Sequence, residues 1–94
     1  MTERVTHVLI RGRVQGVGFR AWVHHHAELN GLTGWVRNRR DGSVEALFAG
    51  PESELEAMMR ACRQGPAGSI VSSVDMLPDP ERPEGRGFEV LPTR

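Results

Sequence analysis

The residues best suited to chemistry lie in one stretch, RGRVQGVGFR at positions 11–20, between an apolar strand-like run and a helix-like run. The first amides of a helix have no partner within the helix and point outward, so they form a natural binding place for an anion. Gly16 and Gly18 allow the backbone to curl so that successive amides converge. Arg20 adds a planar guanidinium group that suits a phosphate. This stretch therefore predicts a cradle for a phosphate-like group.

The same stretch has simpler interpretations, which stay open from the residues alone. A glycine-rich turn between a strand and a helix is often only a tight turn, with its arginine in solvent. It is not a Walker loop, because no Gly-Lys-Ser/Thr follows, and it lacks the glycine spacing of a dinucleotide fingerprint. A second candidate is Asn38, at the end of an expected strand, although asparagine is also a common turn residue.

The elements that must position these residues follow from periodicity and turn signals. Asp41-Gly42 lies between two strand-like runs, which predicts a hairpin. Asn30-Gly31 and Gly65-Pro66 predict the ends of two helices. We predict strands over 5–14, 35–36, 44–48, 69–77 and 88–91, helices over 19–30 and from Pro51 to Gly65, and a polar loop over 78–87.

This order predicts an α+β fold, a ferredoxin-like α/β sandwich of the pattern βαββαβ. Such a fold has an antiparallel sheet, here of four to five strands, with two helices on one face. Alternation places Val8 and Ile10 on one face of the first strand, and His7, Leu9 and Arg11 on the other. The rest of the expected core consists of apolar residues at helical spacing on the two helices, together with two tryptophans. These residues are Phe19, Trp22, Val23, Ala27, Trp35, Leu55, Met58, Met59 and Cys62.

Length and composition limit the class of protein. The 94 residues carry 12 basic and 12 acidic side chains, so the formal net charge is zero, which argues against a dedicated nucleic-acid or membrane surface. The single cysteine, Cys62, cannot form an intramolecular disulfide, and the N-terminus does not resemble a signal peptide. We expect a single domain over 1–94, in a monomeric cytoplasmic protein with no nucleic-acid or membrane partner.

The run His24-His25-His26 suggests a metal site at first sight. Successive side chains on a helix point about 100° apart, so three in a row cannot converge on one ion. We therefore expect solvated histidines and no metal.

Three segments in order, GRVQGVGFR at 12–20, GWVRN at 34–38 and DGSVE at 41–45, resemble the acylphosphatase family. The resemblance implies an enzyme that hydrolyses the carboxyl–phosphate bond of small acyl phosphates without a metal or other cofactor. It implies that Arg20 binds the phosphoryl group and that Asn38 positions the attacking water. It also implies that the phosphate is held by the backbone amides of Gln15, Gly16, Val17, Gly18, Phe19 and Arg20.

The residues agree with that chemistry, because the segments offer charge stabilisation but no evident general acid or base. An acyl phosphate expels a carboxylate, whose conjugate acid has a pKa of roughly 4, so the leaving group needs no proton. An alkyl phosphate would leave as an alkoxide and would need far more help. We expect the substrate's own phosphate, whose second pKa is near 6, to accept the proton of the water.

Three alternatives remain at this stage. One is an acylphosphatase-like domain that handles carbamoyl phosphate, and another is a ferredoxin-like module that binds RNA or an anion without catalysis. The third is a protein that keeps the fold with little activity. Whether Arg37, Arg39 and Arg40 steer an anionic substrate towards Asn38 or are only solvated charges is also open.

Overall fold

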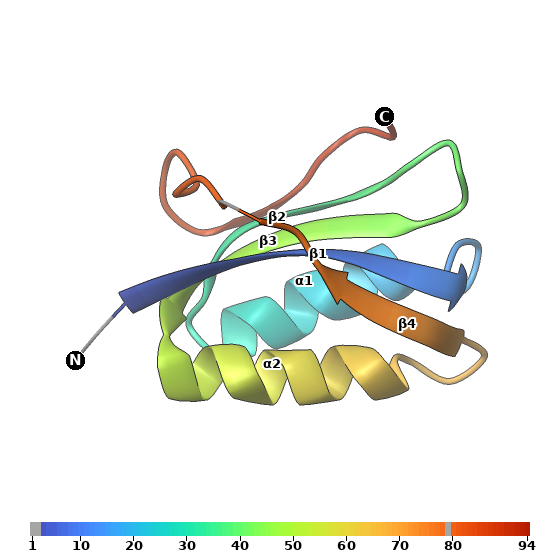
Figure 1. Cartoon of the computed structure of the whole chain (residues 1–94), viewed down its shortest axis with the longest axis horizontal. Coiled ribbons are helices and arrows are strands. Elements are labelled where there is room, and N and C mark those ends of the chain that lie inside the picture. The colour runs from blue at the N-terminus through green and yellow to red at the C-terminus, as the bar shows by residue number, and fades with distance from the viewer. Residues whose placement is uncertain (1–2, 79) are drawn as a thin grey trace.

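The computed structural model of the protein, which describes residues 3–78 and 80–94, has the predicted order of elements. Figure 1 shows the sheet as one layer and the two helices as a second layer on one of its faces. Asp79, within the predicted polar loop, and the first two residues lie outside the described part. The elements are β1 (Glu3–Arg13), α1 (Phe19–Leu29), β2 (Thr33–Asn38), β3 (Val44–Pro51), α2 (Glu52–Gln64), β4 (Ile70–Met76) and β5 (Phe88–Val90).

The sheet has five strands in the order β4-β1-β3-β2-β5. The first four strands pair antiparallel, as predicted, whereas β5 pairs with β2 in parallel. The difference from a wholly antiparallel sheet has a simple cause. After β4 the chain reverses and returns to the opposite edge of the sheet, so β5 runs in the same direction as β2. The structure is therefore a ferredoxin-like sandwich with one extra parallel strand.

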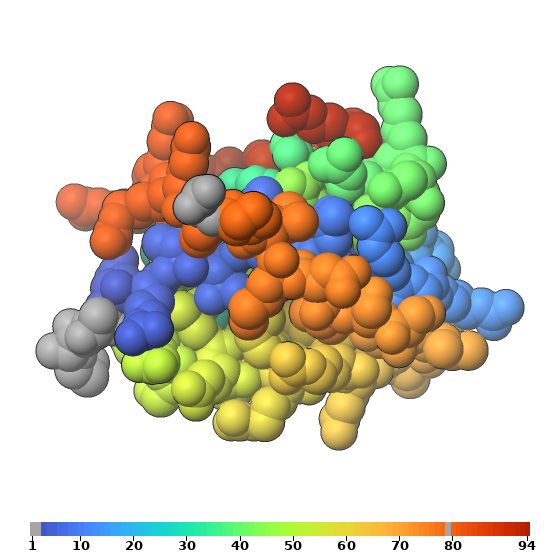
Figure 2. Space-filling view, viewed as in Figure 1, coloured from blue at the N-terminus to red at the C-terminus, as the bar shows by residue number. Residues whose placement is uncertain are grey.

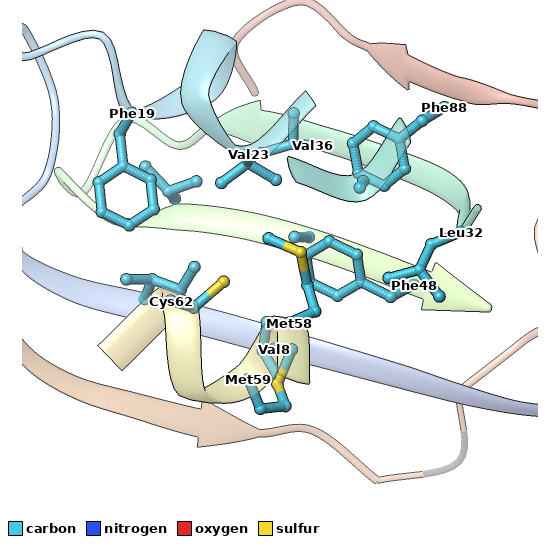
Figure 3. Close-up of a cluster of buried hydrophobic side chains, with 14 of the residues drawn as sticks. Val8, Phe19, Val23, Leu32, Val36, Phe48, Met58, Met59, Cys62 and Phe88 are labelled. Carbon is cyan, nitrogen blue, oxygen red and sulfur yellow. The ribbon is translucent and has the colours of Figure 1, made fainter. Parts of the chain in front are cut away.

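The core lies between the sheet and the helices, where apolar side chains are removed from water. Val8 and Ile10 of β1 are fully buried there, which confirms the predicted alternation. Figure 3 shows Phe19 and Val23 of α1 and Met58, Met59 and Cys62 of α2 facing Val36 and Phe48 of the sheet. Burial raises the pKa of the Cys62 thiol to about 12, which agrees with a packing role.

Two expectations about the elements are wrong in detail. Pro51 precedes α2 as its N-cap instead of taking the first helical position, because its ψ of 145° is extended. Trp35 lies outside the core: its neighbours Gly34 and Val36 are buried against the helices, so its own side chain projects from the other face. There the Arg37 guanidinium carbon lies 4.5 Å from the centre of the Trp35 ring.

The histidines of α1 match the predicted solvated triplet only in part: His25 is exposed, whereas His24 and His26 are half-buried. The ring of His26 packs against Trp22, with centroids 4.4 Å apart, and His26 is half-buried. His24 lies 3.5 Å from the Glu28 carboxylate, one helical turn away. No helix in the described part of the chain is long and apolar enough to cross a membrane.

Candidate active site

The loop between β1 and α1 bends through two glycines in the left-handed region, Gly16 at φ 75° and Gly18 at φ 77°. Residues other than glycine rarely adopt this backbone conformation. Gly18 is the N-cap of α1, and its carbonyl accepts the first helical hydrogen bond, from the Trp22 amide at 3.0 Å. The amides ahead of Trp22 therefore lie at the positive end of the helix dipole.

The backbone amides of residues 15–20 have no acceptor among the hydrogen bonds of the described part of the chain. Within 3–78 and 80–94, none of them donates a hydrogen bond to another residue outside the helix ladder. Buried or half-buried amides usually find a partner. A run of unpaired donors at a helix N-terminus is a place where an anion binds well.

Beside these amides is a hollow of about 340 Å³. Its lining includes the predicted site residues Gln15, Gly16, Gly18, Phe19, Arg20 and Asn38, together with Val14, Ala21 and Val90. Two segments far apart in the sequence thus meet at one place. Val17 is the exception, because its side chain packs against the core. Arg20 is half-buried, and among the described residues no carboxylate lies within 4.0 Å of it.

Asn38 reaches the hollow from the last position of β2, where it pairs with Val44 across the hairpin. The predicted Asp41-Gly42 turn is present, with the Gly42 amide donating to the Arg39 carbonyl at 3.2 Å. The Oδ1 atom of Asn38 is buried and has no hydrogen-bond partner among the described residues. Unpaired buried acceptors are rare in folded proteins, and each one calls for an explanation.

The Gln15 side chain fixes the loop to this hairpin. Its Nε2 group donates to the carbonyls of Arg39, at 2.7 Å, and Ser43, at 2.8 Å. Sequence reasoning assigned only a backbone role to Gln15. A glutamine inside an otherwise apolar and glycine-rich turn was the available signal, but its partners come from a segment more than twenty residues away.

The C-terminal residues brace the same strand end. The Arg94 amide donates to the Asn38 carbonyl at 3.0 Å, and the Arg94 carbonyl accepts from the Arg40 amide at 3.1 Å. Figure 2 shows the last residues, in red, beside the green hairpin. The backbone at Asn38 is therefore held from two sides, by β3 and by the C-terminal segment.

On the opposite face of the sheet, the Glu45 side chain of β3, which is only 5% exposed, binds two guanidinium groups and an imidazole. One carboxylate oxygen accepts from Arg37 at 2.8 Å and from Arg39 at 3.0 Å, and the other accepts from His7 at 2.6 Å. Burial by itself raises the pKa of Glu45, but these hydrogen bonds outweigh burial and lower it below the ordinary 4.5. Arg37 and Arg39 are thus bound to a carboxylate instead of being free charges.

The hollow can bind and orient but carries no evident proton-transfer group. None of the side chains that line it is a carboxylate, an imidazole or a thiol. Over residues 3–78 and 80–94, no group of three or more His, Cys, Asp or Glu side chains is arranged to hold a metal ion. What the lining offers is a guanidinium, backbone amides and the side-chain amide of Asn38, a set of groups that could bind an anion and stabilise its charge.

The strand order and the two helices place the protein among ferredoxin-like α/β sandwiches. The profile of the Acylphosphatase family matches residues 6–90. An acylphosphatase of Bradyrhizobium diazoefficiens is 53% identical over 98 residues, with 99% of each chain covered. The chain belongs to the acylphosphatase family, a family of hydrolases.

Solved structures agree with this assignment. The crystal structure of an acylphosphatase from Bacillus subtilis superimposes with a TM-score of 0.87 at 34% identity, covering 96% of this chain and 99% of that one. Full-length HypF in its phosphate- and nucleotide-bound form matches with a TM-score of 0.82 at 26% identity, and the match covers 99% of this chain but 13% of HypF. The same architecture thus occurs both alone and as part of a larger chain.

Proposed function

We propose that this protein hydrolyses the carboxyl–phosphate bond of small acyl phosphates to a carboxylate and inorganic phosphate, without a metal or other cofactor. The observation that carries the proposal is the hollow that brings Arg20 and the loop of residues 15–20 beside Asn38, whose Oδ1 has no partner among the described residues. Donors for an anion and a side-chain amide that can orient a water therefore line one hollow.

Binding comes first in this mechanism. The phosphoryl oxygens accept hydrogen bonds from the loop amides and from the Arg20 guanidinium, whose planar fork suits a phosphate. Since the loop is anchored through Gln15, these donors are already oriented before substrate arrives. Donors fixed in advance stabilise the charge of the transition state without reorganising during the reaction.

Asn38 then orients the nucleophile. The Asn38 side-chain amide holds a water, which keeps one of its protons and attacks phosphorus from the side opposite the acyl oxygen. The bond between phosphorus and the acyl oxygen breaks, and the carboxylate leaves with that electron pair. The second proton of the water passes to a phosphoryl oxygen, so the products are a carboxylate and dihydrogen phosphate. No protein base is required, which suits a hollow lined without carboxylate or imidazole.

The leaving group limits the substrate class. A carboxylate, with a conjugate acid of pKa roughly 4, departs unprotonated, whereas the alkoxide of an alkyl phosphate does not. Carbamoyl phosphate satisfies the same requirement and stays a second candidate substrate. RNA binding is disfavoured, because Phe48, an aromatic on a central strand, is fully buried and stacked against Phe88 at 5.5 Å.

We further propose a monomeric cytoplasmic enzyme acting as a single domain over 1–94. The lone Cys62 is buried in the core and suits a reducing compartment. Sedimentation of the purified protein at several concentrations tests the monomer directly.

The test of the reaction is hydrolysis of benzoyl phosphate in EDTA by the wild type and by Asn38→Ala. We expect rapid turnover by the wild type, unchanged by the chelator, and a loss of kcat of about a hundredfold or more in the variant, because the water is no longer oriented. Carbamoyl phosphate is assayed in parallel. A folded wild type that turned over neither substrate would refute the proposed function.

A further inference from the structure

The direction of the Asn38 side chain is set from outside the hollow. Since Oδ1 has no partner in the described part of the protein, no hydrogen bond to that atom holds it in place. Its direction therefore depends on the backbone at positions 37–39. Backbone hydrogen bonds at Asn38 and Arg39 join this segment to β3 and to the C-terminal residues, and the side chains of its neighbours give it further contacts.

A single carboxylate, that of Glu45, binds the side chains on both sides of Asn38, and we call this arrangement the clasp. Arg37 Nε and Arg39 Nη1 both donate to Glu45 Oε1, at 2.8 and 3.0 Å. Because side chains alternate along a strand, these two lie on the face opposite Asn38. Holding both neighbours on one side of the sheet directs Asn38 to the other side, where the hollow is.

The clasp is itself rigid. Glu45 is 5% exposed and Arg37 14% exposed, so neither is free to exchange its partner for water. The second carboxylate oxygen is occupied by His7 Nε2 at 2.6 Å, and the His7 ring packs edge-on against Trp35 at 5.7 Å. Charge-assisted hydrogen bonds to both oxygens fix the plane of the carboxylate.

We propose that Glu45 is a positioning residue for the reaction, acting through Arg37 and Arg39 to keep Asn38 in its productive orientation. This inference rests on the proposed function. Apolar side chains of similar volume often stabilise a protein as well as a buried ionic cluster does, so the stability of the fold does not by itself require this cluster. What the cluster adds here is a fixed direction for the strand end that carries Asn38.

The test is a double-mutant cycle of Glu45→Gln and Asn38→Ala, with benzoyl phosphate as substrate and thermal melts to verify folding. Glutamine keeps the shape of Glu45 but cannot accept both guanidinium groups as strongly. We expect Glu45→Gln to lower kcat about tenfold while KM rises less than twofold, because neither Glu45 nor its partners line the hollow that would hold the phosphate. In the Asn38→Ala background the same change should cost less than twofold.

A purely structural role predicts a different pattern. If Glu45→Gln lowered activity equally with and without Asn38, or raised KM in parallel with the loss of kcat, the inference would be wrong. An unchanged kcat in folded Glu45→Gln would also overturn it. An inactive wild type would refute the proposed function, and this inference with it. An active wild type with an unaffected Glu45→Gln variant would refute this inference alone.

A milder variant guards against poor folding of Glu45→Gln. Arg39→Met removes one arm of the clasp, and its side chain is 37% exposed, so the fold should tolerate the change. We expect a loss of kcat of about threefold, again absent in the Asn38→Ala background. The matched control is Asp75→Asn, which breaks the surface pair with Arg11 at 3.4 Å and should leave kcat unchanged.

Discussion

At the end of β2, the two faces of the sheet differ in how fully their polar side chains are hydrogen-bonded. On the helix face, the Oδ1 atom of Asn38 has no partner within the described residues, and the nearby loop amides are equally free. On the open face, both oxygens of Glu45 are occupied by Arg37, Arg39 and His7. A polar group left unpaired suits a ligand, whereas a saturated one belongs to the framework.

This contrast shows how a small protein can separate binding from stability. The groups that we propose to contact substrate have few partners in the described part of the chain, so they add little to the stability of the folded state. The groups behind them are fully paired, so they hold the strand end without competing for substrate. Changes on the helix face should therefore alter activity with little effect on stability, and changes on the open face should alter both.

The largest expected effect belongs to Arg20. Arg20→Ala should lower kcat/KM by about a thousandfold, because the variant lacks the guanidinium that we propose binds the phosphoryl group. Its melting temperature should stay near that of the wild type, since no ion pair of Arg20 is found within the described residues. The measurement is benzoyl phosphate turnover beside a thermal melt.

Arg13→Ala is the matched control for Arg20, because Arg13 is exposed at the end of β1 and does not line the hollow. Its activity should change less than threefold, by weaker long-range attraction. Equal losses in the two variants would mean that general charge, and not a specific contact, drives binding.

The bridge between loop and hairpin should give an intermediate effect. Gln15→Met keeps the length of the side chain but removes both hydrogen bonds to the Arg39 and Ser43 carbonyls. We expect a loss of about 1–2 kcal/mol in the free energy of unfolding and about tenfold in kcat/KM, because the donors lose their fixed arrangement. Urea unfolding and steady-state kinetics measure the two; a large kinetic loss without any loss of stability would contradict the bridge.

The smallest expected effect is the loss of stability at acidic pH through Glu45. Because the folded-state pKa of Glu45 lies below 4.5, its stabilising contribution is complete above that pH and disappears as the pH falls through the folded-state pKa. The difference in melting temperature between wild type and Glu45→Gln should therefore be full at pH 6 and should shrink below about pH 4.5. A difference in melting temperature that stayed constant down to pH 3 would contradict the lowered pKa of Glu45.

Asp41→Asn is the control in the acid series. Hydrogen bonds from Ser43 also lower the pKa of Asp41, but this carboxylate lies at the exposed tip of the hairpin. The Asp41→Asn change should alter the dependence of the melting temperature on acidic pH less than the Glu45→Gln change does, since solvent screens an exposed group.

Much of the fold could be predicted because it depends on local patterns. Alternation placed Val8 and Ile10 in the core, and the spacing of Leu55, Met58, Met59 and Cys62 predicted the buried face of α2 correctly. Trp35 was misplaced because the face of a strand depends on register: Trp35 pairs with Leu47, and its buried neighbours turn it outward. The parallel pairing of β5 likewise depends on where the chain crosses the sheet, which a loop sequence does not specify.

The sequence by itself determined the candidate site: a glycine turn ending in Arg20, an asparagine before a hairpin, and a resemblance carried by those two segments. Turn chemistry and helix geometry are local, so residues 15–20 suffice to predict them. Only the tertiary structure decided which groups stay unpaired. Whether Asn38 Oδ1 finds a partner, or Glu45 finds three, depends on residues brought together from distant segments, and contacts between distant segments follow from packing and not from the local chain.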